Sequence, residues 1–420
     1  MKARFTPALF AHAEAVLGQL LRFDFPADAV VSRYFREHRA LGHADRAFVA
    51  ETVFAVLRRG RSIEACCAGK LSDRARLLVA LAVTRGWSQR DLAPVLKAGE
   101  EEWLAAAKSM PESDFSPAVR CDLPHWLYER LAAQFGAEET LALAEALNQP
   151  APLDLRVNTV KTNRDALLGQ FAAEGIAALP GSLSPLAIRL RDKPALARHP
   201  LFLAGAFEVQ DEGSQLLGYL LEPRRGEMVV DFCAGAGGKT LLLGALMKNT
   251  GRLYAYDVSD KRLARLKPRL ARSGLSNVHP VRIEHERDTR IKRLGGKVDR
   301  VLVDAPCSGL GTLRRNPDLK WRQSEDSVVE LALKQAAILE AAARLVRPGG
   351  RVVYATCSLL AAENEAVVDA FLAGHSDFTL VPASEVLARH GIVLEGDTLR
   401  LVPHRQHTDG FFAAILDRKP

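Results

Sequence analysis

Two cysteines follow two neighbouring predicted strands in the C-terminal part of the chain. Cys307 lies in DAPCSG (304–309), and Cys357 lies in YATCS (354–358). A single free cysteine is more often a small buried hydrophobic residue than a reactive one, but two at equivalent strand ends favour chemistry. Asp304 and Pro306 add a carboxylate and a rigid turn to the first loop. This set predicts covalent catalysis at the edge of a sheet.

These residue types suit methylation of a carbon in an electron-poor ring, such as C5 of cytosine. That carbon is a weak nucleophile until a thiolate adds to C6 and makes C5 resemble an enamine, which splits one difficult step into easier ones. A carboxyl group such as that of Asp304 can stabilise the ring near N3. A base must then remove the C5 proton so that the thiol is expelled, and a second thiol can serve as that base.

A glycine-rich loop, DFCAGAGGKT (231–240), follows the first strand of the same predicted sheet. Its glycines allow the backbone to approach a bound ligand closely before a helix begins. The next strand ends at Asp257, which is placed to accept hydrogen bonds from ribose hydroxyls or, alternatively, to cap a helix. Nucleotide and dinucleotide folds also carry such loops. A nucleoside triphosphatase is a poor explanation, because the P-loop spacing would require glycine at Cys233.

The order of predicted strands and helices indicates where these loops lie. After Gln215, short β-rich runs alternate with helices, which is typical of a parallel, doubly wound sheet with helices on both faces. In such sheets the ligand lies beyond the carboxyl ends of the strands. Residues 5–110 instead show helical spacing throughout, and MPESDFSPAVRCDLP (110–124) has the composition of a linker.

We therefore predict an α/β protein of three domains. An all-helical domain spans 1–112, and a small α+β domain with strands at LDLRVNT and LAIRL spans 120–215. The doubly wound catalytic domain spans 216–420.

Several of these segments together resemble the RNA (cytosine-5) methyltransferase family, especially its Sun-type bacterial 16S rRNA enzymes. The resemblance rests on DFCAGAGGKT, DAPCSGLGTLRRNPD, YATCSLLAAENE, HTDGFF, FEVQDEGSQL and LRVNTVK. REHRALGHADRAFVAETVFAVLRRG is similar to the N-terminal domain of Sun-type members, which resembles the antitermination factor NusB. The likeness covers nearly the whole chain. It implies a Rossmann-like S-adenosylmethionine-dependent methyltransferase domain with an all-helical, NusB-like RNA-binding domain before it.

The resemblance also implies roles for individual residues. Cys357 becomes the nucleophile, Cys307 assists product release, and Asp304 faces both cofactor and base. The implied cofactor is S-adenosylmethionine, and its implied contacts are Cys233, Ala234, Gly235, Ala236, Gly237, Gly238, Lys239, Asp257, Arg262, Asp288 and Asp304. The family usually has proline where this chain has Ala236, and Glu286 is an alternative to Asp288 as the third acidic contact. No metal is expected.

Composition agrees with a soluble globular protein. Of the 420 residues, 48% are hydrophobic and 25% are charged, and no apolar run is long enough for a membrane helix or signal peptide, so a cytoplasmic protein is expected. The six cysteines lack zinc-type spacing and should be reduced thiols. A net charge of +7 is a mild electrostatic bias toward polyanions.

Two basic stretches are candidate RNA contacts. Residues 261–300 contain thirteen Lys or Arg against four Asp or Glu. LRRNPDLKWR (313–322) leaves the Cys307 loop directly, and its basic residues with Trp321 predict a surface that holds a splayed nucleotide. The resemblance implies 16S rRNA or an assembling small ribosomal subunit as the partner of a monomeric enzyme.

Three other readings stay open at this point. DNA cytosine methyltransferases also use a cysteine after a proline, as in Pro306-Cys307, but the cysteine of TCS and the lack of a separate target-recognition region favour RNA. A non-catalytic RNA-binding assembly factor would have lost a motif cysteine, whereas both are present. A transferase for a small molecule or protein would leave the basic N-terminal part without a purpose. The pattern does not identify the modified cytosine.

Overall fold

The computed structural model describes residues 5–420, which divide into two compact units. The first unit contains the residues up to Pro150 together with Thr312–Glu325. The second contains Ala151–Gly311 and Asp326–Pro420. The chain therefore leaves the second unit for the short segment 312–325 and then returns to it.

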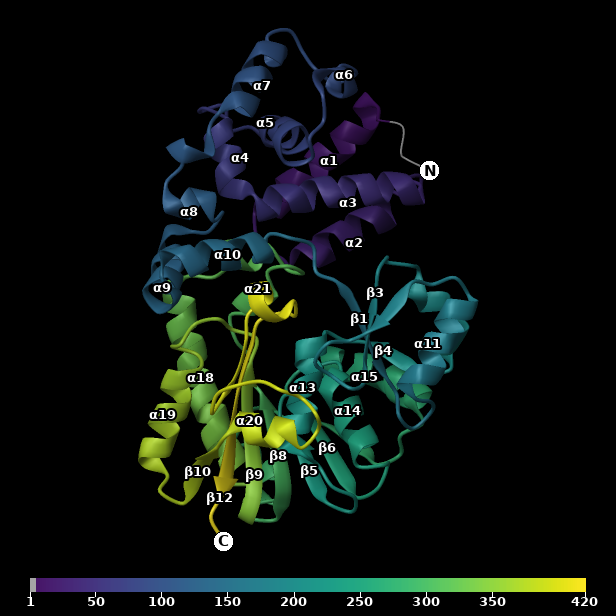
Figure 1. Ribbon diagram of the computed structural model, residues 1–420, viewed down its shortest axis with the longest axis vertical. Helices are drawn as coiled ribbons and strands as arrows, with labels where there is room; N and C mark the ends of the chain where they lie inside the picture. Colours follow the sequence, from purple (N-terminus) through teal and green to yellow (C-terminus); the bar gives the residue numbers. More distant parts are fainter. Residues whose placement is uncertain (1–4) are drawn as a thin grey trace. The chain divides into compact units, whose positions relative to one another are not determined.

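The first unit is helical over the part that the structure describes (Figure 1). Its elements are α1 (Pro7–Leu20), α2 (Ala27–Glu37), α3 (His43–Arg58), α4 (Gly60–Cys66), α5 (Asp73–Val79), the π-helical turn η1 (Ala80–Thr84), α6 (Gln89–Leu92), α7 (Glu100–Ser109), η2 (Glu112–Asp114), α8 (Pro117–Arg120), α9 (His125–Phe135), α10 (Ala137–Leu147) and α17 (Leu319–Arg322). The helical character predicted for residues 5–110 is confirmed.

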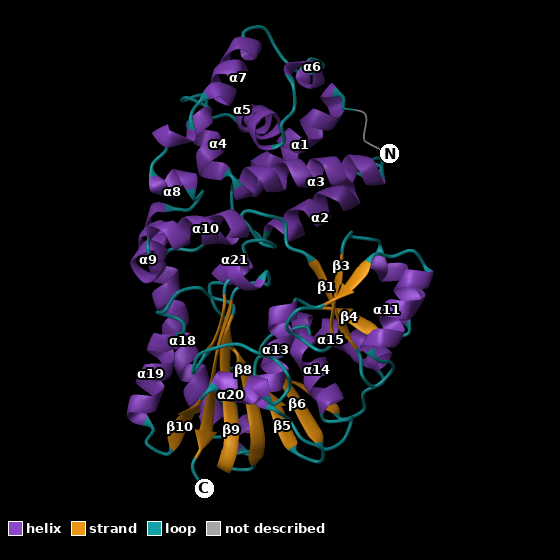
Figure 2. Cartoon of the chain, viewed as in Figure 1, coloured by secondary structure: helices purple, strands orange, loops and turns teal. Residues whose placement is uncertain are grey.

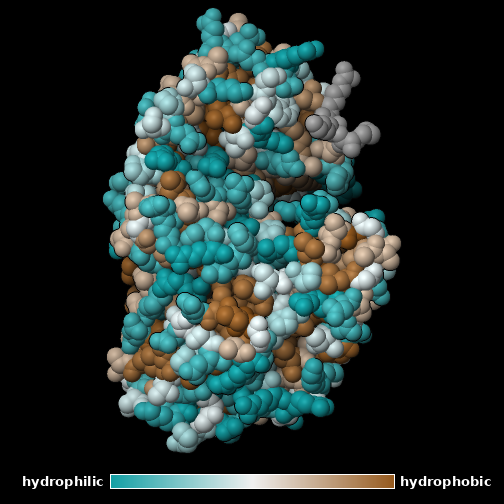
Figure 3. Space-filling view, viewed as in Figure 1, coloured by the Kyte–Doolittle hydropathy of each residue, from teal (hydrophilic) through white to brown (hydrophobic). Residues whose placement is uncertain are grey.

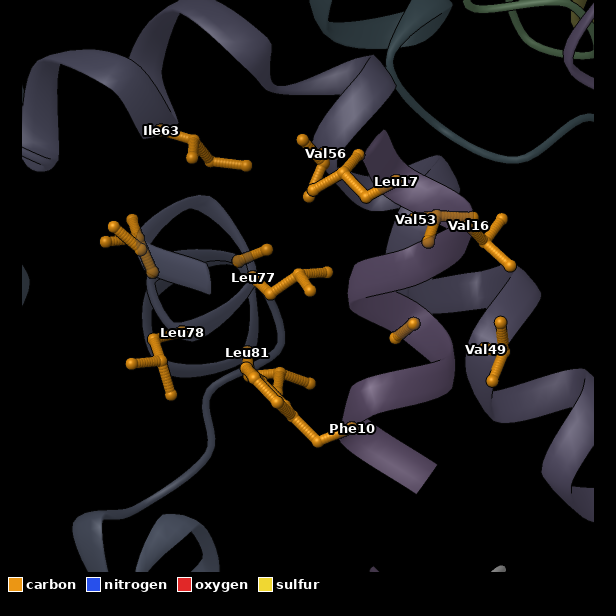
Figure 4. Close-up of a cluster of buried hydrophobic side chains, with 14 of the residues drawn as sticks. Phe10, Val16, Leu17, Val49, Val53, Val56, Ile63, Leu77, Leu78 and Leu81 are labelled. Carbon is orange, nitrogen blue, oxygen red and sulfur yellow. The ribbon is translucent and has the colours of Figure 1, made fainter. Parts of the chain in front are cut away.

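The core of this unit forms because its helices carry apolar residues at helical spacing. Figure 4 shows buried side chains from these helices gathered in one cluster, among them Leu17 of α1, Val53 of α3 and Leu77 of α5. All three side chains are buried. Residues three or four positions apart share one helix face, so each helix buries one stripe.

The segment predicted to be a linker is instead folded into the first unit. It contains η2 and α8, and it ends beside the buried carboxylate of Asp122. That carboxylate accepts a hydrogen bond of 2.8 Å from the backbone N–H of Ser62 and forms an ion pair of 3.3 Å with Arg59. The polar, proline-containing composition predicts a linker, but the stretch contains helical turns and its aspartate is a buried acceptor that fixes it to α4.

The second unit begins with a small antiparallel sheet of order β2-β3-β1-β4. Its elements are β1 (Leu153–Val157), α11 (Arg164–Ala173), β2 (Ala178–Pro180), β3 (Ala187–Leu190), η3 (Leu196–Arg198), α12 (Pro200–Leu203) and β4 (Phe207–Val209). The strands predicted at LDLRVNT and LAIRL are β1 and β3. Leu155 and Val157 point into a core with Phe171, so the alternation of a strand places Arg156 on the opposite face.

The large sheet has the order β10-β12-β9-β8-β5-β6-β7, with β11 paired to β12 (Figure 2). Strands β5 to β9 pair in parallel, and β12 runs antiparallel to β9 and β10. The strands are β5 (Met228–Asp231), β6 (Arg252–Asp257), β7 (Val278–Arg282), β8 (Val298–Asp304), β9 (Val346–Thr356), β10 (Phe378–Val381), β11 (Leu399–Leu401) and β12 (Phe411–Arg418).

Helices cover both faces of this sheet. They are α13 (Glu212–Leu221), α14 (Gly238–Leu246), α15 (Asp260–Ser273), α16 (Thr289–Lys292), α18 (Glu325–Ala343), α19 (Glu365–Gly374), α20 (Ala383–Ala388) and α21 (Pro403–Gln406), with the short turn η4 (Leu310–Thr312) after β8. In β8, Leu302 joins the core under α13 and α14, whereas Val301 and Val303 join the core under α18 and α19. Burial of both faces explains the continuous apolar runs of the parallel strands. The predicted fold class is confirmed.

Among residues 5–420, no helix is long and apolar enough to cross a bilayer. On the face shown in Figure 3, hydrophilic residues are interspersed with smaller hydrophobic patches.

Candidate functional site

A cavity of about 400 Å³ lies at the carboxyl ends of β5, β6, β8 and β9. This is the edge at which parallel doubly wound sheets bind ligands. The predicted site residues that line it come from segments far apart in the chain and are Cys233, Ala234, Gly235, Ala236, Gly238, Lys239, Asp257, Arg262, Asp304, Cys307 and Cys357. The structure thus brings together the cofactor loop and both cysteines.

The glycine loop is held in shape by Asp257. Gly235 has φ of +57°, in the left-handed region that favours glycine, and its backbone N–H donates to Oδ2 of Asp257 at 2.8 Å. Oδ1 of Asp257 accepts from the backbone N–H of Ser259 at 2.7 Å and lies 3.2 Å from the guanidinium of Arg262. The carboxylate therefore joins the first two strand ends of the cavity.

Gly237 is part of the loop but does not line the cavity. Its φ is +85°, and a Cβ atom there would lie 2.1 Å from Cδ1 of Leu266. This glycine therefore permits close packing of the loop against α15 and does not itself face a ligand.

Asp288 does not line the cavity either, whereas Glu286 does. The carboxylate of Asp288 accepts from the backbone N–H groups of Glu284 and Arg290, both at 2.9 Å, and these bonds hold its pKa below the usual range. Asp288 thus caps the short helix α16. The geometry favours Glu286, the alternative that the spacing left open.

Lys239 and Asp304 form an ion pair of 2.7 Å in the cavity wall. Burial acts to lower the pKa of Lys239, but the charge of Asp304 and the hydrogen bond between the two groups outweigh it, so the pKa is raised. The ammonium also lies over the ring of Phe411, 5.5 Å from its centroid. The carboxylate of Asp304 therefore lines the same cavity as the two cysteines and is paired there with a positive charge.

The sulfur atoms of Cys307 and Cys357 lie 3.3 Å apart. This exceeds the length of a disulfide bond, about 2.05 Å, and the six cysteines of the chain are free thiols. The hydrogen bond to Cys357, followed by burial and then by the charges of Cys357 and Glu363, raises the pKa of Cys307 well above its usual value. The surroundings of Cys307 thus favour its protonated thiol.

Asp231 lines the same cavity and was not predicted to have a role. Burial raises its pKa to about 7, against the hydrogen bond of 2.6 Å from Thr240 Oγ1, and the nearby charge of Asp304 adds to the increase. The neighbouring thiol of Cys233 also has a raised pKa, mainly through burial. The only sequence signal for Asp231 is its place at a strand end.

The small sheet supports the cofactor loop, which sequence reasoning missed. The buried guanidinium of Arg156 donates to Oε1 of Gln210 at 2.7 Å and to the carbonyl of Gly238 at 2.6 Å. Gln210 and Ser214, from the segment FEVQDEGSQL, line the cavity themselves. The alternation of β1 could have placed Arg156 on this face, but its partner could not be identified without the fold.

The predicted RNA contact at LRRNPDLKWR is contradicted for Lys320 and Trp321. Lys320 is 1% exposed, and its ammonium donates to the carbonyl of Arg58 at 2.6 Å and to Oδ1 of Asn148 at 3.0 Å. The indole N–H of Trp321 donates to the carbonyl of Leu57 at 2.8 Å, within the first unit. The basic and aromatic composition here serves packing inside a helical unit.

Part of the basic stretch 261–300 is also used internally. Arg269 and Arg272 both pair with the buried carboxylate of Glu208, at 2.9 Å and 2.5 Å. Arg300 pairs with Glu227 at 2.8 Å. These three cations are therefore not a free phosphate-binding track.

The residues of the cavity fit S-adenosylmethionine. The volume lies within the range of roughly 300–1,000 Å³ that is typical of small-molecule sites. Left-handed Gly235 opens the backbone to a ligand, Asp257 follows the second strand, and Arg262 and Lys239 supply positive charge for a carboxylate. Fold and site together define an S-adenosylmethionine-dependent methyltransferase.

Comparison with known proteins identifies the family. Residues 218–417 match the model of the 16S rRNA methyltransferase RsmB/F family, and residues 123–196 match the ferredoxin-like domain of RsmF/B-like methyltransferases. The chain is 33% identical to a probable ribosomal RNA small subunit methyltransferase B of Synechocystis, over 96% of this chain and 98% of that protein. The chain therefore belongs to the RsmB/F family of methyltransferases.

Solved structures show the same fold. The crystal structure of PH0851 aligns with a TM-score of 0.81 at 29% identity and covers 100% of both chains. NSun6 from Pyrococcus horikoshii with SFG aligns with a TM-score of 0.63 at 23% identity, over 71% of this chain and 98% of that chain.

Proposed function

We propose that the protein methylates C5 of a cytosine in 16S rRNA through a covalent bond between Cys357 Sγ and C6 of the base. The observation that carries this proposal is the pair of thiols, 3.3 Å apart, in the same cavity as the Lys239–Asp304 ion pair and the cofactor loop. The names of the family and of its relatives support ribosomal RNA as the substrate.

Each residue has a distinct task in this reaction. Bound S-adenosylmethionine supplies an electrophilic methyl group, and Asp257, Gly235 and Arg262 hold it in the cavity, with Glu286 in place of Asp288 as the further acidic contact. Cys357 Sγ adds to C6, which makes C5 nucleophilic. Asp304, fixed by Lys239, faces the ring near N3.

Cys307 acts at the end of the reaction. It is the nearest titratable neighbour of Cys357 Sγ for which the structure gives a hydrogen bond. To act as the base, Cys307 first gives its own proton to N3 of the ring. The resulting thiolate, whose pKa is raised by its surroundings, then takes the proton from C5, and N3 of the methylated base releases the other proton to solvent. The bond between Cys357 Sγ and C6 then breaks, and the thiolate returns to Cys357.

The experiment that tests the proposal compares two variants. Cys357→Ala should be inactive and form no covalent complex, because C5 is never activated. Cys307→Ala should add to RNA but release it slowly, so a protein–RNA adduct that survives denaturing electrophoresis should accumulate. The double variant should lose that adduct, and Cys66→Ala is a control from the first unit.

The reverse pattern, an adduct from Cys357→Ala and none from Cys307→Ala, would move the nucleophile to Cys307. The DNA-type mechanism would then be the better explanation, and DNA should be assayed beside rRNA. Bisulfite sequencing of RNA from cells with and without the gene would locate the modified cytosine.

The domain division predicted above, at 1–112, 120–215 and 216–420, is part of the proposal. The helical N-terminal part is proposed to select the RNA, as a NusB-like module of a monomeric, cytoplasmic enzyme.

A further inference from the structure

The two cysteine loops are joined behind the sulfur atoms by one carboxylate. Ser308 follows Cys307 and Ser358 follows Cys357. Both hydroxyls donate to Oε2 of Glu363, that of Ser308 at 2.5 Å and that of Ser358 through a still shorter contact. The two hydroxyl oxygens lie 3.2 Å apart. A single atom of Glu363 therefore links the ends of β8 and β9.

The other oxygen of Glu363 fixes the backbone on both sides of Cys307. Oε1 accepts from the backbone N–H of Ser308 at 2.8 Å and from the side-chain amide of Gln335 at 2.9 Å. The same amide donates to the carbonyl of Pro306 at 3.0 Å. The backbone is thus held on both sides of Cys307, at the carbonyl of Pro306 and at the N–H of Ser308.

The carboxyl oxygens of Glu363 are fully supplied with hydrogen bonds. Four contacts reach them, from the backbone N–H and the hydroxyl of Ser308, the hydroxyl of Ser358 and the amide of Gln335. Glu363 and Gln335 are both 0% exposed, so these hydrogen bonds replace the hydration that the carboxyl group loses on burial. Glu363 does not line the cofactor cavity.

We propose that Glu363 is a positioning residue that holds Cys307 and Cys357 at reacting distance. The consequence for catalysis rests on the function proposed above, but the effect on the thiols themselves does not. Neither the sequence resemblance nor the family comparison assigns Glu363 a task.

The charge of Glu363 acts on Cys307 directly. It contributes to the raised pKa of that thiol, after the hydrogen bond to Cys357, burial and the charge of Cys357. Removing the charge should therefore lower the pKa of the Cys307 thiol. The titratable groups around Cys307 in these elements are Cys357, Glu363, Tyr354, Lys239 and Asp304.

The experiment compares Glu363→Gln with Glu365→Gln in the full-length protein. Glutamine keeps the size of the side chain but turns one acceptor into a donor that faces other donors. The control, Glu365, lies two residues on and pairs with Arg400 away from the cysteine loops. S-adenosylmethionine affinity should stay within about twofold of wild type in both, whereas the methylation rate of Glu363→Gln should fall about 100-fold, as for misplaced reacting groups.

Thiol alkylation by iodoacetamide supplies a second measurement that needs no RNA. Cys307 and Cys357 fall in separate tryptic peptides, 301–314 and 352–389, so mass spectrometry can follow each thiol as pH is varied. The pH midpoint for Cys307 should move down in Glu363→Gln and stay in place in Glu365→Gln. An unchanged midpoint in Glu363→Gln overturns the proposal, whether or not the methylation rate falls.

The double variant Ser308→Ala/Ser358→Ala covers the case in which Glu363→Gln does not fold. It removes the hydroxyl link but keeps the charge, so methylation should slow about tenfold while the Cys307 midpoint stays raised. A wild-type methylation rate in the double variant would overturn the proposal. If wild-type protein itself neither methylates rRNA nor forms an adduct, the proposed function fails, and the alkylation profiles still decide the role of Glu363.

Discussion

The thiols of the two units have different environments although they are the same residue type. Cys67 and Cys121 are buried in the first unit, where desolvation raises the pKa of each to about 11. Cys307 and Cys357 stand at strand ends, line a cavity and contact each other. A cysteine therefore gains chemistry from its position at a ligand edge and from a partner, and burial alone makes it inert.

Buried lysines show the same contrast. Lys239 in the second unit faces Asp304, and its pKa is raised. Lys320 in the first unit donates to a carbonyl and a side-chain amide, and burial without an opposing hydrogen-bonded charge lowers its pKa to about 7. The cavity thus holds a charged pair, whereas the helical unit holds a lysine close to neutrality at physiological pH.

The largest expected effect contrasts the nucleophile with a buried thiol. Cys357→Ala should reduce methylation at least about 10⁴-fold, the scale seen when a covalent nucleophile is removed. Cys67→Ala should retain the methylation rate and lose about 1 kcal/mol of stability, since it leaves only a small cavity. Rate and thermal unfolding measured on both variants check this. A comparable rate loss in Cys67→Ala would break the distinction between the two regions.

The next effect separates two aspartates of the second unit. Asp257→Ala removes the acceptor of the Gly235 and Ser259 amides, and loss of such charged hydrogen bonds should weaken S-adenosylmethionine binding by roughly 10- to 100-fold. Asp288→Asn should leave the affinity within about twofold, because that carboxylate caps α16 outside the cavity. Calorimetric titration of both variants measures the difference, and equal weakening would restore Asp288 to the site.

Sequence reasoning succeeded where a local pattern was sufficient. Alternating strands and helices predicted the parallel sheet. Residues directly after parallel strands meet at one edge, so Cys307, Cys357 and Asp257 were expected to lie together, and they line one cavity. The strands β10 to β12 were not predicted, because the argument stopped at the last motif-bearing strand.

Residues that act through distant partners could not be found in this way. Arg156 and Glu363 touch the catalytic loops only through the tertiary fold, and nothing in their local sequence names a partner. The prediction for Trp321 was wrong for the opposite reason. Its basic neighbours suggested an RNA contact, whereas its hydrogen-bond partner lies 264 residues away in α3. Removal of residues 1–112 would take away the hydrogen-bond partners of Trp321 and Asp122. Such a truncation would disturb folding, so it is a poor test of RNA selection.

Trp321→Ala tests whether this side chain stabilises the first unit or contacts RNA. The indole packs against Gly60, where a Cβ atom would lie 2.9 Å from Cζ2, and it donates to the Leu57 carbonyl. Loss of the indole should lower the free energy of unfolding by about 2 to 3 kcal/mol, which is less than for loss of a fully buried tryptophan. The affinity for S-adenosylmethionine should not change. Chemical denaturation and calorimetry test this. A fall in RNA affinity with unchanged stability would instead support the RNA contact predicted from sequence.

A pH dependence of stability is expected from Lys320. Its pKa is about 7 in the folded protein and about 10.4 in an unfolded chain, so between these values the unfolded state binds a proton that the folded state does not. Stability therefore rises with pH across this window, by at most about 1.4 kcal/mol per pH unit, and the cost of burying the ammonium is fully present below pH 7. Lys320→Met removes the titration, so the difference in unfolding free energy between wild type and variant should shift in favour of wild type from pH 7 to pH 9. Parallel profiles would show that Lys320 stays charged, and the contrast with Lys239 would then lie in packing alone.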